Sequence, residues 1–306
     1  MSAEVAAVGA NIQLFLFLSL NFYIRMDISI VVPLFNEEDF VKQSLTSLLT
    51  QTYPAKQLVV VDDGSTDNSV AIIRELADTY PNLKLIKSNG TSSHAPGEKV
   101  VRAFMRGFDA LSSDWDVICK FDADIIFPEN YLEQLKESFS SNERMGMFGG
   151  LLTIGKKDSW VVESISRNNH LRGPIKAYSK ACYNDVGGLR PVLGWDTLDE
   201  LLAMHRGYQV MIDDKLMVKH LRPTGSKYSF KGAVAKGRLF YELGYGLALG
   251  VLASIKWSFT QRGSLLAALR GFLLAWLSRK PKFVTNKEAR FIRRYRWSQI
   301  FSRFIT

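Results

Sequence analysis

The sequence predicts an α/β domain on a mostly parallel sheet with helices on both faces, followed by amphipathic helices at the C-terminal end. Three observations lead to this prediction. Short runs of β-branched residues alternate with longer helical stretches, the apolar runs are continuous, and polar clusters follow them directly. Continuous apolar strands that are separated by helices indicate a parallel sheet covered on both faces.

Length and composition set the limits of the fold. The 306 residues, 47% of them apolar, are enough for one large or two modest domains. The formal charge is +9, and from Lys256 to the end of the chain the only acid is Glu288. Such a basic tail suggests an anionic membrane surface or nucleic acid as a partner. The cysteines and histidines lack the spacing of a zinc site, so any metal is expected to be held by carboxylates.

Three parts of the chain are expected. Residues 1–26 form an apolar extension whose apolar run, 13–24, is shorter than the ~20 residues that a spanning helix needs. Met26 is a plausible alternative start, so the extension is either an artefact of start-site choice or a membrane anchor. Residues 27–225 form the α/β domain, and residues 226–306 form a basic helical region.

The elements of the α/β domain follow in order. Ile28 to Leu34 is a buried strand, and the acids Glu37 and Glu38 predict the first turn of a helix that runs to about Gln51. The next elements are predicted as a strand over 58–61, a helix over 68–79, a strand over 83–87, a helix over 97–111 and a strand over 116–121.

Polar residues stand at the carboxyl ends of three of these strands: Asn36-Glu37, Asp62-Asp63 and Asp122-Ala123-Asp124. Ligands of such sheets bind beyond the carboxyl ends of the strands, so the three clusters are expected to meet at one edge. Neither a dinucleotide-type glycine fingerprint nor a phosphate-binding loop is present in the sequence. An Asp-x-Asp at this place suits Mg²⁺ or Mn²⁺ with a diphosphate, although the same motif alone also fits a solvated turn.

The order of these motifs resembles that of the family 2 glycosyltransferases, which are inverting enzymes of the GT-A fold that use nucleotide-diphosphate sugars. The matching segments are "SIVVPLFNE" from Ser29, "VVDDGSTD" from Val60, "GEKVVRAFMRG" from Gly97 and "KFDAD" from Lys120. The resemblance covers about residues 27–225, and the C-terminal segments are similar to those of bacterial members that build surface polysaccharides.

The resemblance implies roles at the donor site for nine residues: Pro33, Asn36, Glu37, Asp62, Asp63, Lys99, Asp122, Asp124 and His220. The first three would line the nucleoside pocket, Asp62 and Asp63 would contact the base and the ribose, and Lys99 would lie near the base or the diphosphate. Asp122 and Asp124 match the Asp-x-Asp motif, with Asp124 as the direct ligand of Mn²⁺ or Mg²⁺. His220, after a strand-like segment, would complete the metal site or contact the diphosphate, and the alternative is a structural histidine.

The general base is expected in the segment Gly194 to Tyr208, "GWDTLDELLAMHRGY". The family places an acidic pair at the start of this helix, and here Asp196 stands at the base position while Trp195 replaces the first acid. Asp196 is favoured as the base, and Asp199 or Glu200, one turn later, is the alternative. All three acids also fit the start of any helix, where the dipole favours them. Trp195 is expected either to stack on the acceptor sugar or to belong to the core.

The C-terminal region changes in character after residue 225. Its apolar segments, 240–258 and 264–277, are interrupted by charges and do not give a clean span of ~20 residues. Interleaved arginines and aromatic residues predict helices that lie in a membrane interface, and the alternative is a helical subdomain packed on the core. The only RxxRW, Arg293 to Trp297, lacks the Gln of processive relatives, which favours single transfers over polymer synthesis.

The expected function is an inverting, metal-dependent transfer of one sugar, UDP-linked, to a glycan or lipid-linked acceptor in cell-surface polysaccharide biosynthesis. The expected location is the cytoplasmic face of the cell membrane, as a peripheral or monotopic protein. One alternative is a membrane-associated protein that binds sugar nucleotides without turnover. Binding of nucleic acid is disfavoured because basic and apolar residues interleave in the tail.

Overall fold

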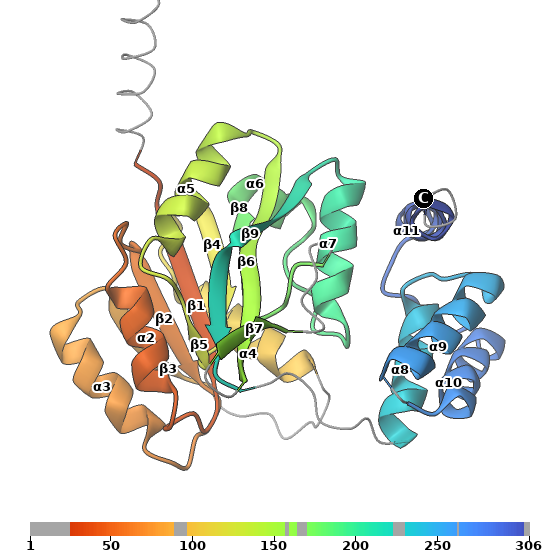
Figure 1. Ribbon diagram of the computed structural model, residues 1–306, viewed down its shortest axis with the longest axis horizontal. Helices are drawn as coiled ribbons and strands as arrows, with labels where there is room; N and C mark the ends of the chain where they lie inside the picture. The colour runs from red at the N-terminus through yellow and green to blue at the C-terminus, as the bar shows by residue number, and fades with distance from the viewer. Residues whose placement is uncertain are drawn as a thin grey trace, which may run out of the picture.

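The computed structural model describes residues 25–88, 97–156, 159–163, 170–222, 230–261 and 263–302. This part of the chain forms one twisted nine-stranded sheet with helices on both faces and a group of helices at the C-terminal end (Figure 1). The strand order is β3-β2-β1-β4-β8-β6-β9-β5, and β7 pairs with β6. The predicted extension 1–26 lies outside the described residues except for Arg25 and Met26.

The first half of the sheet is parallel, and its predicted strands are confirmed. The strands are β1 (Ile28–Leu34), β2 (Gln57–Asp62), β3 (Leu83–Lys87) and β4 (Val117–Phe121). The helices between them are α2 (Val41–Leu49), α3 (Ser69–Thr79) and α4 (Glu98–Asp109). Strand β1 is central, with β2 and β4 as parallel neighbours. Continuous apolar runs separated by helical stretches were therefore sufficient to predict this half.

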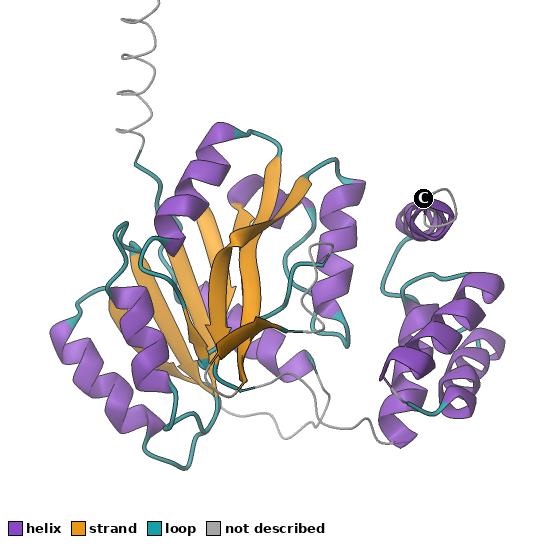
Figure 2. Cartoon of the chain, viewed as in Figure 1, coloured by secondary structure: helices purple, strands orange, loops and turns teal. Residues whose placement is uncertain are grey.

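Both faces of the parallel half are buried because alternate residues of each strand enter different cores. Ile30 and Val32 pack in a cluster with the residues of α2, whereas Val31 packs in a second cluster beneath α4. Helix α4 lies very close to the sheet, since a Cβ atom at Gly107 would overlap the side chains of Val31 and Val61. Figure 2 shows α2 and α3 together at one edge of the sheet.

The second half of the sheet is mixed. Its strands are β5 (Ile125–Ile126), β6 (Met145–Lys156), β7 (Ser159–Val162), β8 (Ile175–Ser179) and β9 (Gln209–His220). Strand β8 runs antiparallel to β4 and β6, and β9 runs parallel to β6. At the end of β9, His220 pairs with Ile125. This pairing brings His220 next to Asp124, which lies 96 positions away along the chain.

The start of the first helix differs from the prediction. Helix α2 begins at Val41, so Glu37 and Glu38 lie in a turn and not in its first turn. Asn36 has a left-handed backbone with φ of 52°. The backbone N–H of Glu37 donates to Ser69 Oγ at 2.8 Å. Phe40, with φ of −120°, has a non-helical backbone, so the regular helix begins only after it.

Three helices accompany the second half of the sheet: α5 (Tyr131–Ser141), α6 (Lys180–Asp185) and α7 (Trp195–His205). Helix α7 begins at the predicted place and carries the three acids of the proposed base segment. Gly194 precedes it with φ of 71°, and a Cβ there would come within 2.7 Å of Leu239 Cδ2. A helix from the C-terminal region therefore approaches the start of α7 closely.

The C-terminal region consists of α8 (Phe230–Glu242), α9 (Leu247–Gln261), α10 (Leu265–Leu277) and α11 (Asn286–Phe301). It packs on the α/β domain, because Leu239 and Ile292 share one buried cluster with Leu198 of α7. A hydrogen bond from the Arg190 guanidinium to the backbone carbonyl of Phe283 adds a second connection. The alternative prediction, a helical subdomain packed on the core, therefore holds for the face of this region that contacts the α/β domain. In the described chain, no helix is both long and apolar enough for a bilayer crossing.

Candidate active site

A cleft of about 270 Å³ lies at the carboxyl edge of the parallel strands. Six residues expected at the donor site line it: Pro33, Glu37, Asp63, Lys99, Asp122 and Asp124. They come from the ends of β1, β2 and β4 and from the start of α4. The three polar clusters that were predicted to meet at one edge therefore do so, since parallel strands end on the same side.

The two remaining residues of the first clusters hold the loops beside the cleft. Asn36 Oδ1 accepts the N–H of Thr66 at 2.8 Å, and the N–H of Asn36 donates to Ser65 Oγ at 2.9 Å. Asp62 is buried and accepts the N–H of Ser65 at 2.9 Å. Neither side chain lines the cleft. Their geometry supports a positioning role, because they join the loop after β1 to the loop after β2.

Asp124 is the most enclosed carboxylate of the cleft. Its Oδ2 atom lies 3.6 Å from His220 Nε2 and 3.3 Å from Arg222 Nε. Burial raises the pKa of Asp124, but the hydrogen bond and charge of His220 and the charge of Arg222 outweigh it, so that the net shift is downward. Burial lowers the pKa of His220, whereas Asp124 and Glu163 raise it to about 9. A negative centre at Asp124 is thus already compensated by two cations.

Arg222 was not predicted, although it lies only two positions after His220. Its guanidinium contacts both carboxylate oxygens of Glu37 as well as Asp124. Burial raises the pKa of Glu37 overall, and Arg222 opposes that shift. Arg222 therefore joins the ends of β1, β4 and β9 at the mouth of the cleft. Only the pairing of β5 with β9 brings it there, so a linear motif could not reveal it.

A fully buried lysine supports Asp122. The Lys120 ammonium contacts Asp122 Oδ1, donates a hydrogen bond to the carbonyl of Gly173 at 3.3 Å, and lies 5.3 Å from the ring centroid of Trp195. Lys176, also fully buried, lies 5.6 Å from the same ring. Ammonium groups are attracted to the face of an indole, so Trp195 links the two lysines. We call Lys120, Trp195 and Lys176 the central layer.

Trp195 belongs to the core. Only 6% of its surface is exposed, and a Cβ at Gly173 would come within 3.1 Å of its ring. The expectation that Trp195 stacks on an acceptor sugar does not fit this burial, because both lysines and Gly173 cover the ring. The core alternative is the one that the structure has. Trp195 stands where the family pattern has its first acid, so an apolar ring lies beside the two lysines.

Asp196 is the most accessible of the three candidate bases. Its Oδ2 atom lies 3.7 Å from Nε2 of His170, whose Nδ1 lies 2.6 Å from Oε2 of the buried Glu200. Burial raises the pKa of Asp196, but His170, Lys176 and Arg172 together hold it well below the usual range. The carboxylate is therefore ionised at neutral pH. His170, which the sequence did not single out, orients this carboxylate.

Asp199 is hydrogen-bonded to two residues of β8. Its Oδ1 atom accepts a hydrogen bond from Lys176 Nζ at 2.6 Å, and its Oδ2 atom accepts one from the hydroxyl of Tyr178. Burial raises its pKa to about 6 in spite of the lysine. With both oxygens used and 4% of its surface exposed, Asp199 serves the packing of α7 on β8. Glu200 is similarly occupied by His170, which leaves Asp196 as the acid that can reach a ligand.

The donor set fits a hard divalent cation. Across all the residues that the structure describes, no cluster of three or more His, Cys, Asp or Glu side chains is arranged for a metal. Mg²⁺, however, is usually held by one or two carboxylates plus substrate phosphates and water. Asp122 and Asp124 supply such carboxylates, and His220 Nε2, which lies 3.6 Å from Asp124 Oδ2, would add a nitrogen once its proton is lost. These three residues would hold the ion.

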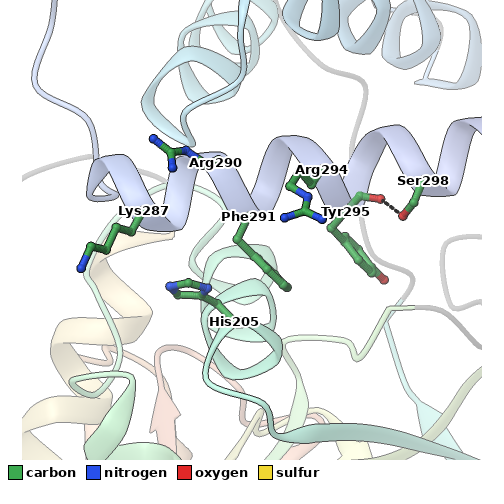
Figure 3. A pocket seen from close by; sticks show the side chains of 7 residues that line it. All are labelled: His205, Lys287, Arg290, Phe291, Arg294, Tyr295 and Ser298. Atoms are coloured by element: carbon green, nitrogen blue, oxygen red, sulfur yellow. Dashed lines mark hydrogen bonds between the residues drawn. The ribbon is translucent and has the colours of Figure 1, made fainter.

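A second cavity, of about 550 Å³, separates the end of α7 from α11. Figure 3 shows His205 on one side and the side chains of α11 on the other. The cavity is lined by His205, Lys287, Arg290, Phe291, Arg294, Tyr295 and Ser298. The ring of Phe291 lies 5.0 Å from that of His205, centroid to centroid. Its rim is basic, in contrast to the acidic cleft at the edge of the sheet.

The sequence model of glycosyl transferase family 2 matches residues 29–184, half of the chain. Among curated relatives, the poly-beta-1,6-N-acetyl-D-glucosamine synthase of Staphylococcus epidermidis is 27% identical over 188 residues, which are 56% of this chain and 42% of that protein. The chain spans less than half of the length of the first curated relatives that it matches.

Two solved structures are similar in fold. The mannosyltransferase PcManGT from Pyrobaculum calidifontis, in complex with GDP-Man and Mn²⁺, has a TM-score of 0.52 and 14% identity and covers 94% of this chain and 88% of its own. Staphylococcus aureus TarS 1–349, in complex with UDP-GlcNAc, has a TM-score of 0.53 and 20% identity and covers 74% of this chain and 67% of its own. The likeness establishes the fold, which is the predicted GT-A fold.

Proposed function

The chain belongs to glycosyl transferase family 2, and we propose that it transfers one sugar, with inversion, from a UDP-linked sugar to a glycan or lipid-linked acceptor for cell-surface polysaccharide. One observation carries this proposal. The candidate base is close to the cleft: the Gly173 carbonyl accepts a hydrogen bond from Lys120, which contacts Asp122 of the cleft, and a Cβ at Gly173 would come within 3.4 Å of Asp196 Cβ. A donor in the cleft would therefore present its sugar toward a carboxylate base.

The donor roles follow from the geometry of the cleft. Asp63 can accept the N3–H of a uracil ring, and Lys99 at the start of α4 can meet the diphosphate. Asp122, Asp124 and His220 would hold Mn²⁺ or Mg²⁺, which, when bound, neutralises charge on the leaving diphosphate. The similar TarS structure contains UDP-GlcNAc, which supports UDP as the carrier, and the PcManGT structure contains Mn²⁺.

The base is assigned to Asp196. As the acceptor oxygen attacks the anomeric carbon, the bond from that carbon to the diphosphate oxygen breaks, and the hydroxyl proton passes to the Asp196 carboxylate. Attack from the face opposite to the diphosphate inverts the anomeric centre. His170 orients Asp196 and is itself fixed by Glu200 at 2.6 Å. The full bonding of Asp199 favours this assignment over the alternatives.

Association with a membrane is assigned to residues 226–306, with residues 27–225 as the catalytic domain. The outer face of α9 and α10 exposes large apolar side chains: Leu247, Leu252, Phe259, Leu266, Leu273, Leu274, Trp276 and Leu277. Arg279, Lys280 and Lys282 follow at once and are also exposed. An apolar face edged by cations suits the boundary between acyl chains and anionic head groups. We assign this contact to the cytoplasmic face, as peripheral or monotopic association.

Donor binding tests the proposal. UDP-, GDP- and dTDP-sugars are titrated into the purified chain with Mn²⁺, with Mg²⁺ or with EDTA, using Asp124→Ala and the exposed Asp78→Ala as a matched control. We expect metal-dependent binding of one UDP-sugar that is lost in Asp124→Ala and kept in Asp78→Ala. Absence of binding to every donor contradicts the proposal. Binding without any transfer or hydrolysis instead identifies a non-catalytic sugar-nucleotide-binding protein.

A further inference from the structure

Arg172 and Lys236 lie near Asp196, Arg296 lies near Lys236, and each of the three comes from a different part of the chain. Arg172 lies just before β8, Lys236 lies on α8, and Arg296 lies on α11. Arg172 and Lys236 each interact electrostatically with Asp196, and Arg172 and Arg296 each interact with Lys236. The packing of the C-terminal helices on the catalytic domain therefore assembles a basic cluster at the candidate base. We call these three residues the Asp196 basic cluster.

The cluster has no anionic partner of its own except Asp196. None of its three side chains has a hydrogen bond or a salt bridge to a residue that the structure describes. The Nε atoms of Arg172 and Arg296 are buried, and neither has a hydrogen-bond partner among the described residues. Arg172 is 9% exposed. A buried guanidinium N–H without an acceptor is unfavourable, so these groups are arranged for an acceptor that comes from outside.

The balance of charge at this place is positive. The Asp196 carboxylate already lies 3.7 Å from His170 Nε2, and the backbone carbonyl of Asp196 accepts a hydrogen bond from Lys176 Nζ. Burial lowers the pKa of the Lys236 ammonium, Asp196 opposes this, and the like charges of Arg296 and Arg172 add to the lowering. Three cations so close together repel one another, which costs stability unless an anion is bound between them.

We infer that Arg172, Lys236 and Arg296 form a subsite for a phosphate group carried by the acceptor. The inference rests on the proposed function, because it is Asp196 as base that makes this the acceptor side. A phosphate suits the cluster better than a single carboxylate, since its three oxygens and double charge can meet two guanidinium groups and an ammonium at once. The phosphate would hold the acceptor with a hydroxyl directed to Asp196.

The phosphate can be carried by a lipid or by a soluble polyol phosphate, and direct binding distinguishes the two. Farnesyl phosphate, glycerol 3-phosphate and uncharged farnesol are titrated calorimetrically into the full-length protein and into Lys236→Gln and Arg296→Gln. We expect both phosphates to bind and each variant to weaken that binding by about tenfold or more, because a charged hydrogen bond is lost. Tighter binding of farnesyl phosphate than of glycerol 3-phosphate assigns the phosphate to a lipid, and equal binding assigns it to the phosphate group alone.

Matched controls lie on the same two helices. Lys231→Gln on α8 and Arg294→Gln on α11 remove the same charge from exposed positions, and both are expected to bind the phosphates as the wild type does. If farnesol binds as tightly as farnesyl phosphate, or if Lys236→Gln binds phosphate unchanged, the subsite is rejected. Loss of binding in Arg294→Gln but not in Arg296→Gln would also reject it, because the phosphate would then sit in the cavity between α7 and α11.

Thermal unfolding gives a second readout that a purely structural role would not produce. Removing one of three mutually repelling charges is expected to leave the melting temperature of the free protein unchanged or raised in Lys236→Gln, while the increase caused by farnesyl phosphate becomes smaller. A lowered melting temperature with an unchanged ligand effect contradicts the inference. The donor titrations of the preceding section are independent: intact donor binding without phosphate binding overturns this subsite alone.

Discussion

The donor cleft and the surroundings of Asp196 are opposite in charge and in origin. On the donor side, carboxylates from the ends of β1, β2 and β4 line the cleft, and cations already contact three of them: Arg222 contacts Glu37 and Asp124, and Lys120 contacts Asp122. On the other side, one carboxylate stands among Arg172, Lys236 and Arg296, which have no such partner in the described chain. The first side suits a cation with a diphosphate, and the second suits an anion.

The comparison also teaches how each side is built. The donor side depends on strand order within one sheet, whereas the other side depends on helices of the C-terminal region that dock against α7. A variant on one side should therefore leave binding on the other side intact. The predictions below test this separation, from the largest expected effect to the smallest.

Asp196→Asn is expected to have the largest effect. It removes the proposed base, so turnover should fall about 10²- to 10⁴-fold, which is the range of general base catalysis. The affinity for the donor should not change, because Asp196 is not among the residues that line the cleft. Transfer kinetics and donor titration measure the two quantities. Normal turnover in Asp196→Asn together with its loss in Glu200→Gln would move the base one turn along α7.

Lys176→Met should destabilise the fold rather than the chemistry alone. It leaves the Asp199 carboxylate buried without its partner at 2.6 Å, which costs about 3–5 kcal/mol of unfolding free energy. The double variant Lys176→Met/Asp199→Leu should recover much of that loss. Urea denaturation measures both, with Lys42→Met at an exposed ion pair as a control that should change little. Equal effects of Lys42→Met and Lys176→Met would show that the central layer is not a structural junction.

His170→Gln should lower turnover by about tenfold, less than the loss of the base itself, because Asp196 keeps its carboxylate but loses its orientation. The hydrogen bond and charge of His170 hold the pKa of Asp196 down, so their removal raises that pKa. Asp196 then becomes protonated at a higher pH, and the acid limb of the kcat/KM profile moves upward. A pH profile that keeps its acid limb in His170→Gln contradicts the role of His170 at Asp196.

Leu266→Ser is expected to have the smallest effect, and only at a membrane. Leu266 is 80% exposed on α10, so its loss should weaken binding to anionic liposomes by about fivefold, as expected for about 1 kcal/mol of apolar burial. Stability in solution should stay the same. Co-sedimentation with vesicles measures the effect, and Met211→Ser, an exposed apolar residue of β9, is the control. If Leu266→Ser and the double variant Leu266→Ser/Leu277→Ser both sediment with vesicles as the wild type does, α10 does not contact the membrane.

Much of the donor side could be predicted from the sequence. Continuous apolar runs of the length of buried strands located β1 to β4. Ligands of such sheets bind at the carboxyl ends of the parallel strands, and this rule placed Asp63, Asp122 and Asp124 at one cleft. The start of α2 was predicted too early, because Asn36 and Glu37 bond to the loop after β2 and not to a helix of their own. Local patterns contain no information about such a partner.

The sequence by itself therefore determined the parallel half of the sheet, the family, and the acids Asp124 and Asp196 as candidates. Only the tertiary structure decided that Trp195 is buried beside two lysines and that both carboxylate oxygens of Asp199 are hydrogen-bonded. It also decided that His170 meets Asp196 and that Arg172, Lys236 and Arg296 come together. The physical reason is that a buried strand can be recognised from a short run of neighbouring residues. These contacts, in contrast, join positions far apart in sequence and exist only once the helices and the sheet have packed.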